Sequence, residues 1–132
     1  HWSAPKVVIF VGTNNINGNE NHASAPEIIR EELSLLIETI LAARADTQIF
    51  YLPITPTIFS WDKWASVREA NRLAAELCQQ YDNVVFVETA DLFLDEKGEP
   101  NKKLFAFDGL HLSAEGYAAW TGRIKPLLQS TE

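Results

Sequence analysis

The stretch KVVIFVG at residues 6–12 decides the fold of this chain. Its central residues, Val7–Val11, are all apolar and mostly β-branched. They lack the alternation of apolar and polar residues that marks a strand with one face in water, so they predict a short strand buried on both faces. Two runs of the same kind, QIFYL at residues 48–52 and VVFV at residues 84–87, predict two more buried strands.

Helical periodicity fills the two segments between these runs. Pro26 suits the first turn of a helix, and apolar residues then recur at spacings of three and four up to about Arg44. A second helix is expected after the loop that begins at Pro53, with Ser60 or Asp62 as its N-cap.

A third helix is predicted after Leu112, with Ser113 as its N-cap. Its spacing predicts an inward side made of Tyr117, Trp120, Ile124 and Leu127. Strands and helices therefore alternate along the chain, which predicts an α/β fold with a parallel sheet. Parallel sheets usually have more than three strands, so we expect this sheet to be incomplete at one edge.

Length and composition bound what the chain does. It has 132 residues, which suits a single domain, and 46% of them are hydrophobic, which excludes intrinsic disorder. The net charge of −7 is unfavourable for nucleic acid and for anionic membranes, which bind clustered positive charge. The apolar run at Val7–Val11 is far shorter than the ~20 residues of a membrane span. The single cysteine, Cys78, forms neither an internal disulfide nor a multi-thiolate metal site.

The first chemical motif is Gly12-Thr13-Asn14-Asn15, at the end of the first predicted strand. Sites in open parallel sheets form beyond the carboxyl ends of the strands. Gly12 allows a sharp turn there, and Asn14 can then present its side-chain N–H to an oxyanion. The alternative is a plain turn, since Gly and Asn are the common turn residues.

The second motif is Asp108-Gly109-Leu110-His111, just before the last predicted helix. A carboxylate three residues from an imidazole can accept its Nδ1–H, which fixes the tautomer and leaves Nε2 as a general base. One alternative is a surface turn before a capped helix. Another is a metal site, which would need a further ligand such as His22.

With both motifs present, the chain resembles the SGNH hydrolases, also called GDSL lipases and esterases. Residues 8–15 look like the family block in which a strand is followed by Gly-x-Asn-Asp, with Asn15 in place of the usual Asp. Residues 108–117 look like its Asp-x-x-His block. The resemblance implies that Asn14 completes the oxyanion hole, that His111 is the base and that Asp108 orients it. It also implies no cofactor and no metal.

The block that carries the family's nucleophile, Gly-Asp-Ser, does not occur in this sequence. We therefore expect residues 1–132 to form one SGNH-like domain that is incomplete at its N-terminus. Its fold would be a three-layer, flavodoxin-like parallel sheet that lacks the first two strand–helix units. None of the serines present is expected to replace the nucleophile: Ser3, Ser24, Ser34, Ser60, Ser66, Ser113 and Ser130.

The implied activity is hydrolysis of a small acyl ester by a Ser-His-Asp triad whose serine lies outside this chain. Trp61 and Trp64 are possible pocket residues, although they can equally cover the end of the sheet. A bare strand edge recruits other chains, so we expect a homo-oligomer or a complementary N-terminal segment as partner. Two other functions stay open: a non-catalytic binding or assembly module on the same scaffold, and a metal-assisted hydrolase that uses Asp108 and His111.

Overall fold

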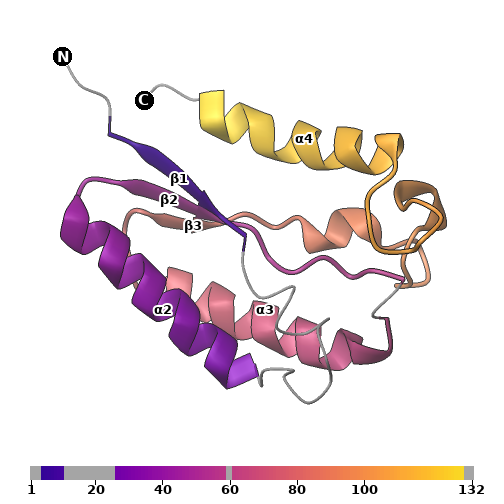
Figure 1. Ribbon diagram of the computed structural model, residues 1–132, viewed down its shortest axis with the longest axis horizontal. Coiled ribbons are helices and arrows are strands. Elements are labelled where there is room, and N and C mark those ends of the chain that lie inside the picture. Colours follow the sequence, from indigo (N-terminus) through magenta and orange to yellow (C-terminus); the bar gives the residue numbers. More distant parts are fainter. Residues whose placement is uncertain (1–3, 11–25, 59–60, 130–132) are drawn as a thin grey trace. The chain divides into compact units, whose positions relative to one another are not determined.

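A computed structural model describes residues 4–10, 26–58 and 61–129 (Figure 1). Strands and helices alternate along these residues, with short 3₁₀ turns between some of them. The elements are β1 (Lys6–Ile9), α2 (Pro26–Ala43), β2 (Gln48–Tyr51), α3 (Trp64–Cys78), β3 (Val84–Phe86) and α4 (Ala114–Gln129).

The order of elements is the predicted one, and the main difference lies at the start of the second helix. Asp62 is not an N-cap but part of a 3₁₀ turn at Trp61–Lys63, and α3 begins after that turn. Ser60 lies outside the described residues. The chain divides into two compact units. The first holds the described residues up to Ile54 together with Ala65–Val87, and the second holds Thr55–Trp64 and the residues from Glu88 onward.

The first unit contains a parallel sheet in the order β1-β2-β3. Val7 pairs with Ile49, and Ile49 pairs with Val84, so the three predicted apolar runs align side by side. This confirms the predicted α/β fold with a parallel sheet. In the described part of the chain β1 is an edge strand, with β2 on one side only.

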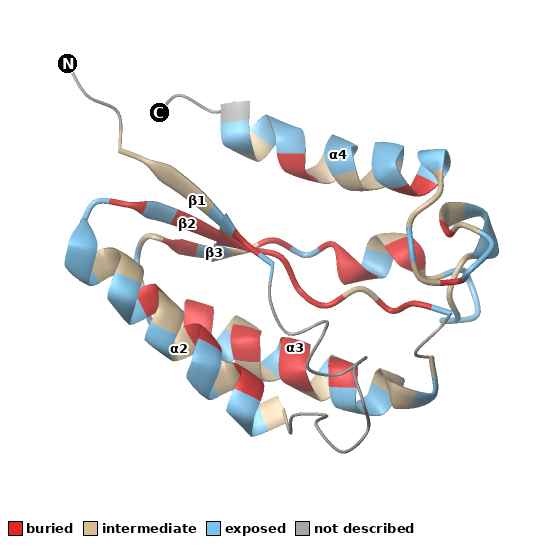
Figure 2. Ribbon diagram, viewed as in Figure 1, coloured by how far each residue is buried: buried red, intermediate tan, exposed pale blue. Residues whose placement is uncertain are grey.

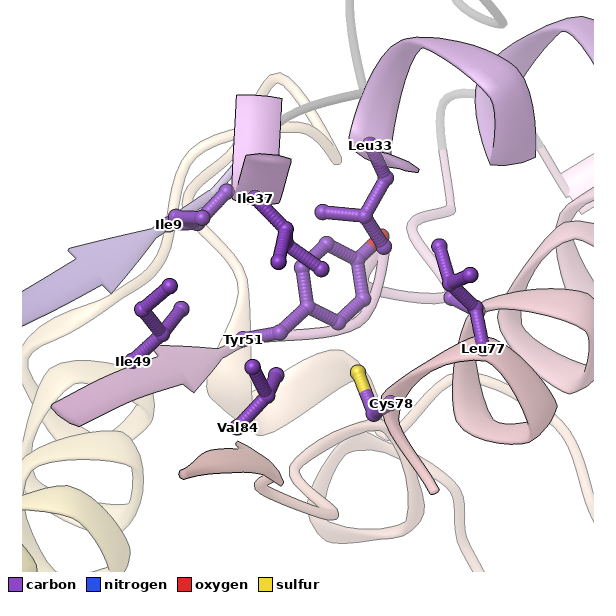
Figure 3. Close-up of a cluster of buried hydrophobic side chains, with 9 residues drawn as sticks. Ile9, Leu33, Ile37, Ile49, Tyr51, Leu77, Cys78 and Val84 are labelled. Carbon is purple, nitrogen blue, oxygen red and sulfur yellow. The ribbon is translucent and has the colours of Figure 1, made fainter. Parts of the chain in front are cut away.

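A hydrophobic core joins one face of the sheet to α2 and α3 (Figures 1 and 2). Figure 3 shows side chains from the strands and from both helices pointing toward one another, with the Tyr51 ring among them. The cluster consists of Ile9, Leu33, Ile37, Ile49, Tyr51, Ala74, Leu77, Cys78 and Val84. Burial raises the pKa of both the Tyr51 phenol and the Cys78 thiol, the latter to about 11. Both groups therefore remain neutral and act as packing residues.

The opposite face of the sheet corrects one prediction. Val8, Phe50 and Val85 form a cross-strand row on that face, because Val8 pairs with Phe50 and Phe50 with Val85. Phe50 is buried, but Val8 is 41% exposed and Val85 is 44% exposed. The prediction of burial on both faces is therefore right for β2 and wrong for β1 and β3. Apolar runs on flanking strands and on central strands look alike in a sequence.

A buried amide fixes the chain where β2 ends. Asn71, on α3, accepts a hydrogen bond from the Ile54 backbone N–H at 2.8 Å and donates one to the Ile54 carbonyl at 3.0 Å. Both backbone groups of Ile54 are thus satisfied by one side chain, as a neighbouring strand would satisfy them. Because Asn71 is buried, the two bonds replace contacts with water that the loop after β2 cannot make.

The second unit is built around Phe93 and Phe105, whose ring centroids lie 5.8 Å apart. Helix α4 packs closely against the 3₁₀ turn at Lys102–Leu104: a Cβ added to Gly116 would lie 2.1 Å from the Leu104 carbonyl oxygen. Only glycine fits at that contact. Tyr117, predicted to face inward, is instead 52% exposed, whereas Ile124 is buried as expected.

Candidate active site

The second predicted motif lies on a loop that closes on itself in front of α4. Phe105 and Leu112 form an antiparallel bridge at its base. Inside that bridge the Ala106 N–H donates to the His111 carbonyl at 2.7 Å, and the Gly109 N–H donates to the Ala106 carbonyl at 2.9 Å. The second of these bonds makes residues 106–109 a β-turn. We call residues 105–112 the histidine loop.

Asp108 organises this loop with both oxygens of its carboxylate. Oδ1 accepts hydrogen bonds from the backbone N–H groups of Leu110, at 2.9 Å, and His111, at 3.0 Å. Oδ2 lies 2.6 Å from His111 Nδ1. The imidazole contact, followed by the two backbone bonds, lowers the pKa of the Asp108 carboxyl to about 2. The carboxylate is therefore ionised at neutral pH and directs Nδ1 to act as a donor.

Gly109 makes this arrangement sterically possible. Its φ is 70°, in the left-handed region that glycine adopts without strain, and it is buried. The chain can therefore reverse direction between the Asp108 carboxylate and the two N–H groups that this carboxylate binds. The predicted contact of Asp108 with His111 is present, and Gly109 is the backbone feature that permits it.

The imidazole of His111 is open to solvent, with 73% of its side chain exposed. Its backbone is nevertheless held on both sides, by the Asp108 carboxylate at the N–H and by Ala106 at the carbonyl. Ser113, just after it, caps α4 as predicted: its Oγ accepts from the Gly116 N–H at 3.1 Å and donates to the Lys103 carbonyl at 2.7 Å. A fixed imidazole with an accessible ring is an arrangement that permits proton transfer to an external group.

The first motif lies outside the described residues, so Gly12, Thr13, Asn14 and Asn15 keep the status of predictions. Trp61 and Trp64 are described. Their rings stack at a centroid distance of 5.7 Å with an interplanar angle of 18°, and both are half-buried. The two indoles thus pack on each other.

Three of the serines are described. Ser34 lies within α2, Ser66 lies within α3, and the hydroxyl of Ser113 is engaged in the α4 cap. The hydrogen bonds of the Ser113 hydroxyl go to Lys103 and Gly116 and not to His111. The other four serines lie outside the described residues.

Sequence reasoning missed two residues of the histidine loop. Ala106 closes the loop through its backbone, which no side-chain pattern reveals. Phe107 occupies a corner of the β-turn and is fully exposed. Its signal was available in the sequence, since an aromatic residue directly before the Asp-x-x-His pattern is unusual turn chemistry.

Two features are absent from the part of the chain that the structure describes. Within residues 4–10, 26–58 and 61–129, no three His, Cys, Asp or Glu side chains gather into a group that could hold a metal ion. Among the helices of the same residues, none has the length and apolar character needed to cross a membrane.

Comparison with known proteins adds to this geometry. The sequence profile of the GDSL-like lipase/acylhydrolase family matches residues 2–119. A search of curated proteins finds no significant match. A solved structure from Streptococcus pneumonia, described as a candidate platelet activating factor, superposes with a TM-score of 0.79 at 26% identity. The esterase domain of the ZfL2-1 ORF1 protein, from a zebrafish retrotransposon, superposes with a TM-score of 0.67, also at 26% identity.

These structures are longer than the part of them that this chain matches. The first alignment covers 94% of this chain but 59% of the Streptococcus protein. The second covers 90% of this chain and 65% of the zebrafish esterase domain. The fold is therefore the flavodoxin-like α/β fold of these structures without some of its units.

Proposed function

Because this chain belongs to the GDSL-like lipase/acylhydrolase family, we propose that it supplies the acid–base part of a serine ester hydrolase. The observation that carries the proposal is the 2.6 Å contact between Asp108 Oδ2 and His111 Nδ1, on an imidazole open to solvent. Asp108 holds the ring in the tautomer whose Nε2 accepts a proton, and it stabilises the imidazolium that then forms. His111 is the general base.

In the proposed reaction a serine hydroxyl, supplied by a segment outside this chain, attacks the carbonyl carbon of a small acyl ester. His111 Nε2 takes the hydroxyl proton and passes it to the leaving alkoxide as the acyl–enzyme forms. Water then attacks the acyl–enzyme, with His111 again as base, and releases the acid. Asn14 donates its side-chain N–H to the oxyanion, and Gly12, Thr13 and Asn15 shape the loop that carries it. No cofactor takes part.

Two further features belong to this proposal. The stacked pair Trp61 and Trp64 lines the site, as an apolar surface for part of the substrate. The esterase description of the zebrafish neighbour supports the class of reaction.

The outer edge of β1 supports the proposal that this chain binds a partner. The carbonyls of Pro5 and Ile9 accept hydrogen bonds from β2, so in a parallel ladder the backbone groups of Val8 point to the other side. No strand in the described residues pairs with that side. We propose that the edge pairs with a copy of this chain or with a complementary N-terminal segment that carries the serine. Light scattering of the chain alone distinguishes the two partners: a dimeric mass supports pairing with a copy, and a monomeric mass contradicts it.

The experiment that tests the function is hydrolysis of p-nitrophenyl acetate, by this chain alone and by the complete gene product that contains it. We expect negligible turnover by the chain alone and His111-dependent turnover by the complete protein. Turnover that a strong chelator abolishes would favour a metal-assisted hydrolase. A complete protein with a Gly-Asp-Ser segment and no turnover of any ester would favour a non-catalytic module.

A further inference from the structure

In the histidine loop, the aromatic side chain of Phe107 has no evident role in folding. It is exposed to 104% of the reference value for phenylalanine. Phe105, two residues earlier, is buried and packs against Phe93 at a centroid distance of 5.8 Å. The loop therefore buries one aromatic ring in the second unit and presents the other to solvent.

Neither turn chemistry nor packing accounts for an aromatic residue at this position. Phe107 is the second residue of the β-turn that the Gly109-to-Ala106 hydrogen bond closes. Small and polar residues and proline predominate at such positions. A fully exposed phenyl ring also contributes no burial of apolar surface to folding.

The backbone beneath Phe107 is fixed relative to the Asp108–His111 pair. The two hydrogen bonds that close the loop flank it in sequence, and the next residue is Asp108, with its three contacts to Leu110 and His111. The ring is thus mounted on the same short, bonded loop as the imidazole. Transition states of acyl transfer are stabilised best where water is excluded, whereas His111 is open to solvent here. An apolar group on the same loop as the imidazole can exclude water once substrate is present.

We propose that Phe107 is a specificity-determining residue that contacts the apolar chain of the ester substrate beside His111. The inference rests on the proposed function and deepens it, because it assigns the substrate class as esters with a chain longer than acetyl. The ring gains its burial from the substrate and not from the protein fold. Removing the ring should therefore lower kcat/KM selectively for long-chain substrates and leave folding unchanged.

The test compares wild type, Phe107→Ser and Leu128→Ser in the complete, nucleophile-bearing protein. Leu128 is an exposed apolar residue of α4 that lies 15 residues after Ser113, so at ~1.5 Å per residue it is remote from the loop. The substrates are p-nitrophenyl acetate, p-nitrophenyl octanoate and octyl acetate. The last two place the long chain on the acyl side and on the alcohol side of the ester.

For Phe107→Ser we expect kcat/KM for one of the long-chain esters to fall about tenfold relative to the acetate, with an unchanged melting temperature. Which ester is affected identifies the side of the substrate that Phe107 contacts. Unchanged kcat/KM ratios, or an equal fall in Leu128→Ser, overturn the inference while His111-dependent turnover keeps the proposed function. A wild-type protein that hydrolyses none of the three esters overturns both.

Discussion

Asp108 binds His111 twice, through the ring and through the backbone. Its Oδ2 lies 2.6 Å from Nδ1 of the imidazole, and its Oδ1 accepts the backbone N–H of the same residue at 3.0 Å. The carboxylate therefore fixes both the position of the residue and the orientation of its ring. A surface turn needs only the backbone bond, so the contact with the ring is the part that indicates chemistry.

Asp108→Asn separates these two roles. The amide oxygen still accepts the backbone N–H groups, but the amide N–H then faces Nδ1 and places the ring proton on Nε2, which can no longer act as base. We expect kcat for ester hydrolysis by the complete protein to fall by about 10²–10⁴-fold.

The matched control for this variant is Asp95→Asn. Asp95 Oδ1 also accepts two backbone N–H groups, those of Lys97 and Glu99, and a glycine of positive φ follows at Gly98. Neither of these hydrogen bonds involves an imidazole. Asp95→Asn should keep wild-type kcat, and an equal loss in both variants would contradict the role of Asp108.

Substitutions of Gly109 test the geometry that supports the pair. Its φ of 70° is tolerated by asparagine but strained for a β-branched residue, so Gly109→Asn should keep the loop and Gly109→Val should distort it. Carbon-detected NMR titration of the Asp108 carboxyl measures the effect in this chain without any need for activity. We expect a pKa of about 2 in wild type, a similar value in Gly109→Asn and a rise toward the ordinary value of ~3.9 in Gly109→Val.

The lowered pKa of Asp108 also makes the stability of the folded chain depend on pH. A carboxyl whose pKa is lowered by folding stabilises the folded state above its unfolded-state pKa. That contribution is lost as pH falls toward about 2. The Asp108–His111 contact should therefore persist throughout the neutral and mildly acidic range. An Asp108 titration near pH 4 in wild type would show that the three contacts are not held in solution.

Alanine substitutions at two glycines of α4 should have opposite effects on the free energy of unfolding. A Cβ at Gly116 would lie 2.1 Å from the Leu104 carbonyl oxygen, whereas a Cβ at Gly122 would meet nothing within 4 Å. Gly116→Ala should lower the free energy of unfolding by about 1–3 kcal/mol, because backbone must move to admit the methyl group. Gly122→Ala should raise it by about 0.5–1 kcal/mol, since alanine favours a helix interior. Urea denaturation followed by circular dichroism measures both, and a stabilising Gly116→Ala would contradict the packing of α4.

The thiol of Cys78 should be unreactive in the folded chain. It is buried in the core of the first unit, and burial raises its pKa to about 11, so the nucleophilic thiolate is scarce at pH 8. Reaction with Ellman's reagent at that pH should be slow in buffer and fast in denaturant. Fast labelling of the folded chain would show that the core opens around α3.

The sequence predicted the order of elements because apolar runs and helical spacing are local signals. It failed where neighbours decide the outcome. Val8 and Val85 belong to apolar runs as regular as the one around Phe50, yet the central position of β2 buries Phe50 and leaves the valines half exposed. Tyr117 fits the apolar spacing of α4 but lies on its exposed side.

The same distinction applies to the candidate site. The contact of Asp108 with His111 was predictable because three residues and one glycine determine it. The closure of the loop by Ala106 was not, because it depends on backbone groups that every residue carries. A contact between Asn14 and His111 would join two residues that are far apart in the sequence. It stays a prediction, because Asn14 lies outside the described residues.

The most direct test of the proposed function is ester turnover by the complete protein with and without His111. In the matched pair of wild type and His111→Ala, circular dichroism first confirms equal folding, and kcat/KM for p-nitrophenyl acetate is then measured at neutral pH. We expect His111→Ala to remove nearly all turnover, because His111 is the proposed base for the proton of the nucleophile. A folded His111→Ala protein that retains wild-type kcat/KM would contradict it.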